Sequence, residues 1–389
     1  MNASPDPLPL PEGFRCHVAN VGIKDGSDDF VVVAADRLCS AAGVFTMSSF
    51  AGPSVIVSRR NLEARRATAV VVISKNANVA TGPTGLANAE AVVAGVGERL
   101  GVAANTVLLA STGVIGRQYP MDRVLAGIAA LPATLTHTDA SSVAEGIMTT
   151  DTVRKTASAT VGAARIVGVA KGVGMIEPNM ATLIALFFTD AAVSPEQLDT
   201  SFRRVIDRTF NCVSIDTDTS TSDTAIVLAS GAAGPVDLHD FEIALHQVAL
   251  SLTKQVARDG EGAETLIEVC VDEASSSAQA RTVAKAIVNS PLVKTAVHGA
   301  DPNWGRVAMA IGKATTAAEV DQSAVTICFG DQEVYPGAVS DHDLVALAEY
   351  MRGDEVRIAV SLGAGTHSST VWGCDLTDGY VRINADYTT

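Results

Sequence analysis

The stretch KGVGMIEPNMATLIALFFTD, residues 171–190, decides how the rest of the chain is organised. Its first half contains two glycines and a proline, which interrupt regular structure and favour an irregular backbone. Its second half, residues 183–188, is a continuous apolar run that is typical of a buried strand. The halves meet at Ala181 and Thr182, so a hydroxyl side chain is expected at the mouth of a core strand.

This position is where a chain that cleaves itself would carry its nucleophile. The Thr182 hydroxyl can attack the carbonyl of Ala181, and hydrolysis of the resulting ester leaves Thr182 with a free α-amine. An α-amine titrates at about 7.7–8.0, so near neutral pH it can act as general base for its own hydroxyl. Threonine is also common in strands, and spacing alone leaves open that Thr182 simply begins one.

Composition limits the classes of protein that this chain can belong to. With 389 residues it can bury a large core, and its length suggests two or three structural units. Residues are 47% hydrophobic but only 4% aromatic, which predicts a core of Ala, Val, Ile and Leu. The net charge of −15 repels phosphate backbones and therefore argues against a nucleic-acid partner.

The cysteines and the apolar runs bear on location. Six cysteines are scattered without a CxxC pair, which predicts reduced thiols in a cytoplasmic protein. No apolar run approaches 18 residues without a charge or a break, so we expect no membrane contact. The first residues show neither the basic nor the apolar segment of a leader peptide, and we expect a flexible lead-in.

A second strand end also carries polar residues. The apolar run 106–110 leads into Ser111, Thr112 and Gly113. A hydroxyl residue and a glycine after a strand can leave backbone N–H groups free to face one point, as an oxyanion requires. The same residues commonly form an ordinary turn, so the sequence alone supports either interpretation.

The run KGVGMIEPNMAT followed by LIALFFTDA resembles the processing site of the ornithine acetyltransferase (glutamate N-acetyltransferase) family, whose members split at the Ala-Thr bond. Segments TTDT, DGEGA and DPNWG occur in the family's order and extend the resemblance over nearly the whole chain. The resemblance implies cleavage between Ala181 and Thr182 into residues 1–181 (alpha) and 182–389 (beta). Two copies of each product would form a cytoplasmic heterotetramer.

The resemblance also implies roles for individual residues. Thr182 would be the nucleophile and its α-amine the base, and Thr112 with Gly113 would form the oxyanion hole. A further group would contact the substrate together with Thr182: Thr149, Lys171, Glu261, Asn384 and the terminal Thr389.

The implied reaction moves an acetyl group from N2-acetyl-L-ornithine to L-glutamate through acetyl-Thr182. It releases ornithine and N-acetylglutamate, needs no cofactor, and predicts ping-pong kinetics. Three alternatives remain: an enzyme that also uses acetyl-CoA to acetylate glutamate, an amidase or aminopeptidase that uses water as acceptor, and an inactive binding homologue. The intact set of Thr182, Lys171, Glu261 and the Thr-Gly pair argues against the last.

The segment 211–224 is dense in aspartate and hydroxyl residues. Asp216, Asp218 and Asp223 could suggest a calcium or magnesium loop, but no glycine turn or terminal glutamate follows at EF-hand spacing, so we predict no metal. The family usually reads Asp-Gly-Asp where this chain has Thr217 between two aspartates. That departure bears on loop geometry or on substrate preference.

For the fold, the resemblance implies mixed α/β sheets between helix layers, similar to the N-terminal-nucleophile enzymes. A change in composition at 272–277 predicts a main domain at 1–275 and a smaller C-terminal α/β subdomain at 276–389, whose tail would return to the site. Hydrophobic patterns predict separate strands at 30–35 and 42–47. They also predict a helix at 89–100 capped by Asn88, and helices at 121–131 and 341–352.

Overall fold

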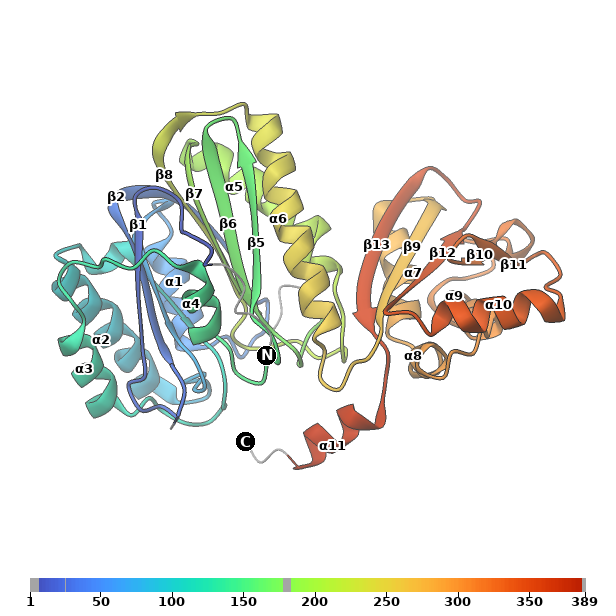
Figure 1. Ribbon diagram of the computed structural model, residues 1–389, viewed down its shortest axis with the longest axis horizontal. Coiled ribbons are helices and arrows are strands. Elements are labelled where there is room, and N and C mark those ends of the chain that lie inside the picture. The colour runs from blue at the N-terminus through green and yellow to red at the C-terminus, as the bar shows by residue number, and fades with distance from the viewer. Residues whose placement is uncertain (1–6, 25, 178–182, 387–389) are drawn as a thin grey trace.

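The structure is a computed structural model that describes residues 7–24, 26–177 and 183–386. Within these ranges the larger sheet has the order β4-β3-β2-β8-β7-β6-β5, with β1 paired to the first half of β2 (Figure 1). Neighbours β3 and β4, and β7 and β8, run parallel, and the other pairs are antiparallel. The strands are β1 Phe14–Ala19, β2 Phe30–Phe45, β3 Arg66–Ile73, β4 Val107–Ser111, β5 Lys155–Val161, β6 Ala164–Lys171, β7 Ile184–Ala192 and β8 Thr224–Pro235.

A second, smaller sheet has the order β11-β10-β12-β9-β13. Its only parallel pair among the described strands is β9 with β12. The strands are β9 Leu266–Ala274, β10 Thr326–Phe329, β11 Gln332–Tyr335, β12 Glu355–Ser361 and β13 His367–Cys374. The chain therefore passes from the larger to the smaller sheet between α6 (Leu238–Arg258) and β9, before the predicted boundary at residue 275.

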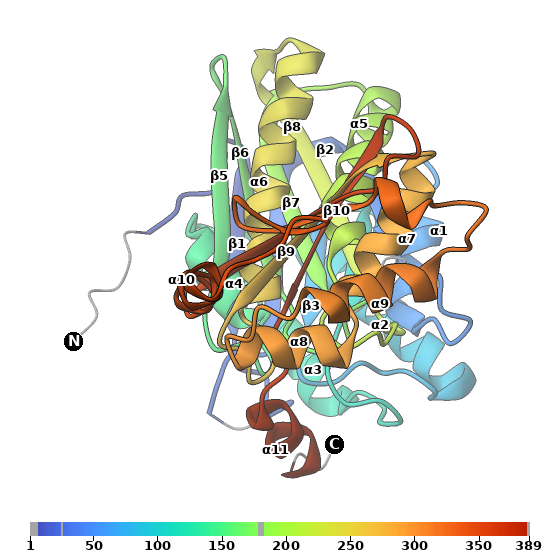
Figure 2. The same ribbon diagram turned by 90° about the vertical axis from the view of Figure 1, so that its right-hand side faces the viewer.

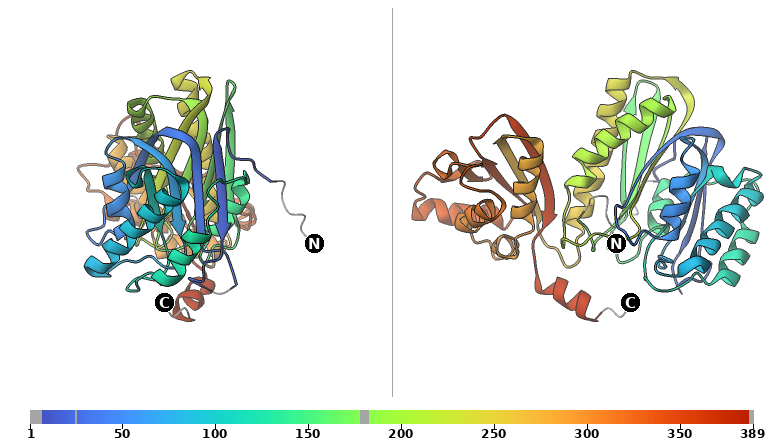
Figure 3. Two further views of the ribbon diagram at one scale, coloured as in Figure 1. Left: turned by 90° about the vertical axis from the view of Figure 1, so that its left-hand side faces the viewer. Right: turned by 180° about the vertical axis from the view of Figure 1, so that it is seen from behind.

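Helices cover both sheets. Helices α5 and α6 line the side of the larger sheet that faces the smaller one, whereas α2 and α3 lie at its far end (Figures 1 and 3). Figure 2 shows α7 and α9 beside the smaller sheet, and α11 extending away from it. The helices are α1 Pro53–Asn61, α2 Gly82–Leu100, α3 Met121–Ala130, α4 Ala140–Gly146, α5 Pro195–Arg208, α6 Leu238–Arg258, α7 Ser277–Val288, α8 Pro291–His298, α9 Trp304–Ala314, α10 Asp341–Met351 and α11 Asp378–Asp386.

Strand β7 lies inside the larger sheet, between β8 and β6, and confirms the predicted buried strand. Phe187 contacts Phe202 of α5 at a ring-centroid distance of 5.5 Å, whereas Phe188 contacts Phe14 of β1 on the opposite face at 5.3 Å. Successive side chains of a strand point to opposite faces, so a strand buried on both sides is apolar throughout. One apolar core continues from Phe187 through α6 to the second sheet.

Two predictions of local structure were wrong. Residues 30–35 and 42–47 do not form two strands, because β2 is continuous and absorbs the intervening polar residues in a register shift between Ala34 and Cys39. Helix α2 begins at Gly82, since a proline in the first turn fits the helix start, and Asn88 lies inside the helix. Helices α3 and α10 confirm their predicted ranges to within one residue at each end.

The structure confirms the predicted α/β fold with mixed sheets and helix layers. The cysteines are all free thiols, and four of them are buried. No helix in the described ranges combines the length and the apolar composition that crossing a membrane requires.

Candidate active site

Two of the predicted site residues meet at strand ends of the larger sheet. Lys171 is the last residue of β6 and pairs in register with Ile184 at the start of β7. Thr112 directly follows β4. The Lys171 Nζ donates to Thr112 Oγ1 at 3.3 Å, and both side chains are buried. The structure thus places a buried ammonium beside the hydroxyl that was predicted to belong to an oxyanion hole.

The backbone of Thr112 differs from the prediction. Its N–H donates to the carbonyl of Ile73 at 3.1 Å, because β3 and β4 pair in parallel up to this point. The amide is therefore not free to bind an oxyanion. Since Lys171 donates to Thr112 Oγ1, the proton of that hydroxyl remains available, and it is the group that Thr112 can offer to a ligand.

Gly113 occupies a position that only glycine fits. Its φ is +125°, and a Cβ built there would lie 2.2 Å from the carbonyl carbon of Lys75 and 2.6 Å from the amide nitrogen of Asn76. Both contacts are with backbone, which cannot move aside as a flexible side chain can. The turn after β4 consequently depends on the close approach of these two segments.

We expect Gly113→Ala to destabilise the protein by more than the roughly 1–3 kcal/mol of a strained backbone conformation alone. The matched control is Gly116→Ala, because Gly116 also has a positive φ, +83°, but open space where the Cβ would lie. Urea unfolding of both variants measures the difference. Equal losses of unfolding free energy in the two variants would show that the close approach of residues 75 and 76 to Gly113 does not contribute to the destabilisation.

Glu261 and Asn384 also meet, although they lie 123 positions apart in the chain. Asn384 Nδ2 on α11 donates to Glu261 Oε2 at 2.9 Å, and the Thr150 hydroxyl donates to Glu261 Oε1 at 3.4 Å. The Glu261 N–H donates to the carbonyl of Val173 at 2.8 Å, two residues after Lys171. The carboxylate thus lies where the C-terminal tail, residues 171–174 (the Lys171 loop) and residues 149–152 (the threonine-rich segment) come together.

Thr149 lies beside this meeting point, and it is the neighbouring Thr150 whose hydroxyl reaches Glu261. The N–H of Thr149 donates to Asp151 Oδ2 at 3.1 Å. The predicted nucleophile and cleavage site, Ala181 and Thr182, and the terminal Thr389 lie outside the described residues.

Asp223 was considered in the sequence only as a metal ligand, and the structure gives it a different position. Its Oδ1 accepts the N–H of Leu183, the residue directly after Thr182, at 2.9 Å. Burial raises the pKa of the Asp223 carboxyl well above its ordinary value, while hydrogen bonds and the nearby Lys171 oppose that shift. Its Oδ2 has no hydrogen-bond partner among the described residues. The carboxyl thus fixes the chain on the carboxyl side of the predicted cleavage site.

A buried ionic cluster was also missed from the sequence. Lys155 Nζ lies 2.7 Å from Asp151 Oδ1 and 2.5 Å from Asp259 Oδ2, and the Lys155 side chain has no exposed surface. Burial alone would raise the pKa of Asp151, but the cations of Lys171 and Lys155 hold it below the ordinary value. The cluster therefore contains ionised carboxylate next to the Lys171 ammonium.

Burial lowers the pKa of Lys171 below its ordinary value. The charges of Asp151, Glu261 and Asp223 act in the opposite direction, and that of Lys155 adds to the lowering. A lysine in this state is desolvated and still held by neighbouring acids, so it is suited to bind a carboxylate.

The aspartates of the 211–224 segment organise the backbone. Asp216 accepts the N–H groups of Met175 and Ile176 at 2.6 and 2.7 Å, so its carboxylate holds the loop that precedes the predicted cleavage site. Thr217 has a φ of +69°, in the left-handed region that favours glycine. The threonine that departs from the family pattern therefore keeps a glycine-like backbone.

One group of possible metal ligands exists within the described residues, at the start of the second sheet. Donor atoms of Glu264, His298 and Asp375 lie within 4.8 Å of one another. Asp375 already accepts two backbone N–H groups through Oδ1 and lies 3.1 Å from His298 Nδ1 through Oδ2. Hydrogen bonds within the protein account for this arrangement.

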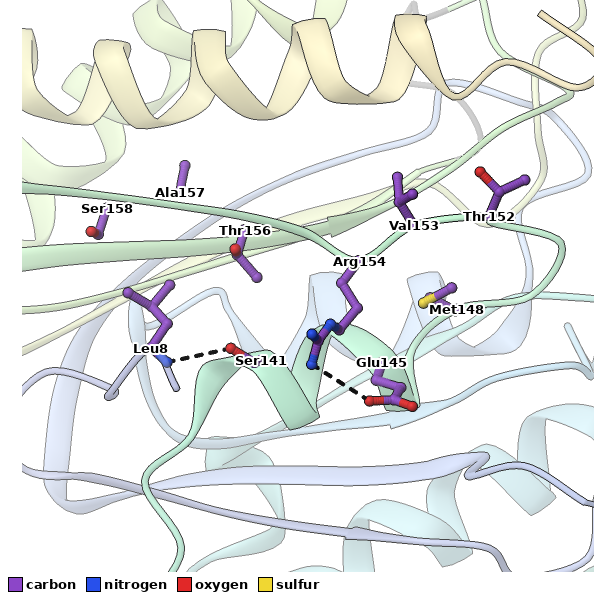
Figure 4. Close-up of a pocket in the computed structure, with 10 residues that line it drawn as sticks. All are labelled: Leu8, Ser141, Glu145, Met148, Thr152, Val153, Arg154, Thr156, Ala157 and Ser158. Carbon is purple, nitrogen blue, oxygen red and sulfur yellow. Dashed lines mark hydrogen bonds and ion pairs between the residues drawn. The ribbon is translucent and has the colours of Figure 1, made fainter. Parts of the chain in front are cut away.

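A cleft of 850 Å³ lies between α4, β5 and the start of the chain, and Thr152 is among the residues that line it (Figure 4). Arg154 faces Glu145 across it at 3.8 Å. The cleft does not include Thr112, Lys171 or Glu261, so it is separate from the candidate site. The residues that line it are Leu8, Ser141, Glu145, Met148, Thr152, Val153, Arg154, Thr156, Ala157 and Ser158.

Comparison with known proteins places the chain among related enzymes. It is 54% identical over 379 residues to "Arginine biosynthesis bifunctional protein ArgJ 2" of Nostoc sp., with 97% of this chain and 98% of the relative covered. It is also 54% identical over 385 residues to "Glutamate N-acetyltransferase Oat2" of Streptomyces clavuligerus, again with 97% and 98% covered.

Solved structures are similar to parts of the chain. An ArgJ structure from Bacillus halodurans has 40% identity and a TM-score of 0.48, covering 51% of this chain and 96% of that chain. An ornithine acetyltransferase complexed with ornithine, from Mycobacterium tuberculosis, has 30% identity and a TM-score of 0.37, covering 43% and 92%. The model of the ArgJ family matches residues 15–389. The resemblance seen in the sequence motifs is thereby confirmed, and the chain belongs to the ArgJ family.

Proposed function

We propose that the chain is a self-processing glutamate N-acetyltransferase of arginine biosynthesis, which moves the acetyl group of N2-acetyl-L-ornithine to L-glutamate. Membership of the family and the names of its relatives support this activity. The observation that carries it is the 3.3 Å contact between Lys171 Nζ and Thr112 Oγ1, formed beside the start of β7. It joins a buried cation for a substrate carboxylate to a hydroxyl that can stabilise an oxyanion.

Each half-reaction follows from these groups. The Thr182 hydroxyl gives its proton to the α-amine and attacks the acetyl carbonyl carbon of N-acetylornithine. The developing oxyanion is stabilised by the Thr112 hydroxyl and the Gly113 N–H. When the C–N bond breaks, the departing amine takes the proton, and ornithine leaves an acetyl ester on Thr182. The amine of glutamate then attacks this ester and regenerates the hydroxyl.

The remaining predicted residues bind the substrates. Lys171 pairs with a carboxylate, and Glu261 with Asn384 faces an amino group. Because Lys171 lies before the Ala181–Thr182 bond and Glu261 after it, both products of self-cleavage supply the site. This sharing supports a stable association of residues 1–181 with 182–389, and we include in the proposal a cytoplasmic heterotetramer of two copies of each.

Intact mass spectrometry of the denatured protein and initial-rate kinetics together test the proposal. We expect two masses, for residues 1–181 and 182–389, and parallel double-reciprocal plots when both substrates are varied. A single full-length mass from active protein would remove the α-amine from the mechanism. Intersecting plots would exclude an acetyl-enzyme intermediate.

A second acetyl donor is the main alternative. The Nostoc relative is named as a bifunctional protein. The second activity that we consider for this chain is the acetylation of glutamate by acetyl-CoA. Thiol release from acetyl-CoA in the presence of glutamate distinguishes this enzyme from one restricted to N-acetylornithine. Acetate release from N-acetylornithine in the absence of glutamate would instead indicate an amidase.

The pH dependence of substrate binding follows from Lys171. Burial lowers its pKa, so the ammonium loses its proton at a lower pH than an exposed lysine does. We therefore expect the KM for N-acetylornithine to rise with pH before the ordinary lysine range is reached. Measuring KM from neutral to alkaline pH checks this. Lys171→Arg is the control, because arginine keeps its charge over this range and the titration of the substrate affects both proteins equally. Identical pH profiles for the two proteins would contradict it.

A further inference from the structure

The buried cluster around Lys155 joins segments that are far apart in the sequence. Lys155 begins β5, Asp151 lies four residues earlier, and Asp259 caps the end of α6. Helix α6 packs against β5 (Figure 1). The Lys155 ammonium lies between the two carboxylates at 2.7 and 2.5 Å, and no part of its side chain is exposed.

Each carboxylate of the cluster also accepts hydrogen bonds from backbone N–H groups. Asp151 accepts the N–H of Gly172 at 2.7 Å, the residue directly after Lys171, and the N–H of Thr149 at 3.1 Å. Asp259 accepts the N–H of Thr152 at 3.1 Å and also its hydroxyl proton. The cluster thus ties the Lys171 loop and the threonine-rich segment to the end of α6.

The end of α6 leads directly to Glu261. The Glu261 N–H donates to the carbonyl of Val173 at 2.8 Å, so the loops that carry Lys171 and Glu261 touch. There is little free space between them, since a Cβ on Gly174 would lie 2.6 Å from the Glu261 carboxylate. A small shift of either loop would therefore change the distance between the ammonium of Lys171 and the carboxylate of Glu261.

A buried ion cluster is a costly way to obtain stability. Removing charges from water carries a large penalty, and well-packed apolar residues of similar volume are often as stabilising. Charge-assisted hydrogen bonds, by contrast, fix direction and distance. A role in positioning explains why three charged groups converge next to the candidate site.

We propose that Lys155 is a positioning residue that fixes Lys171 and Glu261 relative to one another. Because Lys155 and Asp259 lie on opposite sides of the Ala181–Thr182 bond, the same ion pair joins the two products of cleavage at the site. The assignment of Lys171 and Glu261 to substrate binding rests on the proposed function.

Lys155→Met tests the proposal, because methionine fills similar space without a charge. We expect the KM for N-acetylornithine to rise and kcat/KM to fall roughly a hundredfold, the loss expected when a binding group moves by about 1 Å. We also expect faster hydrogen exchange at the Gly172 and Thr152 amides. The matched control is Lys254→Met on α6, where the lysine pairs with Glu268 and Glu355 away from the cluster. This control should keep the wild-type KM and exchange rates.

The double variant Lys155→Met with Asp259→Asn separates positioning from stability. Removing one negative charge restores the charge balance, so we expect the unfolding midpoint to return towards that of wild type. The bridge remains absent, so KM and exchange at Gly172 and Thr152 should stay raised. If KM and protection recover together with stability, Lys155 is merely structural and the proposal is overturned.

Wild-type KM and exchange in the single variant would also overturn the proposal. Should Lys155→Met fail to fold, the double variant alone decides between these outcomes. Should the wild-type protein transfer no acetyl group, the proposed function fails, while exchange at the two amides still decides whether Lys155 positions the loops.

Discussion

Replacing Thr182 by alanine is expected to leave the purified chain at a single full-length mass and to abolish acetyl transfer. The hydroxyl is needed twice, first to attack the carbonyl of Ala181 and then to carry the acetyl group. Loss of a nucleophile typically lowers kcat by about a thousandfold or more. Intact mass spectrometry of the denatured protein and an assay of N-acetylglutamate formation measure the two effects on one sample.

Thr182→Ser is the matched control, because serine keeps the hydroxyl and loses only a methyl group. We expect this variant to be cleaved and to retain measurable transfer. Two masses from the alanine variant would show that cleavage does not depend on this hydroxyl. Transfer by an uncleaved alanine variant would remove Thr182 from the mechanism altogether.

Lys171→Met is expected to have the second largest effect. It removes the buried ammonium beside Thr112 while keeping most of the side-chain volume, and it leaves the neighbouring Asp151 with one cation fewer. Truncating one partner of a buried charge pair costs about 2–5 kcal/mol, so kcat/KM should fall by roughly 30-fold to several thousandfold. Steady-state kinetics with N-acetylornithine as the varied substrate measures this loss.

The control for this variant is Lys75→Met, at the neighbouring end of β3. The Lys75 ammonium donates to Ser27 Oγ at 2.8 Å and has no contact with Lys171 among those that the structure describes. We expect its kcat/KM to stay close to that of wild type. Equal losses in both variants would mean that general positive charge at this edge, rather than the position of Lys171, supports activity.

Local patterns in the sequence were sufficient for the central elements. The apolar run at 183–188 predicted β7 because a strand buried on both faces has no polar alternation. Helix α3 and helix α10 followed from their hydrophobic spacing. The motif at residues 171–182 indicated the family without knowledge of the fold, since its glycines, its proline and the Ala-Thr pair are close together in the chain.

Local patterns were not sufficient where pairing between distant segments decides the structure. The sequence predicted two strands in place of β2, because nothing local shows that neighbouring strands continue past its polar middle. The sequence predicted a free N–H at Thr112, whereas the register of β3 and β4 directs this N–H to the carbonyl of Ile73. Hydrogen-bond partners of this kind are set by strand register, which one segment alone does not encode.

By itself, therefore, the sequence determined the buried central strand, the family and the list of residues expected at the site. Only the tertiary structure decided which acids support them. Lys155 and Asp259 are 104 positions apart, and Asp223 reaches the N–H of Leu183 across 40 positions. Each of these contacts exists because strands and helices of the fold pack together, and burial then makes every charge depend on a partner that no local spacing reveals.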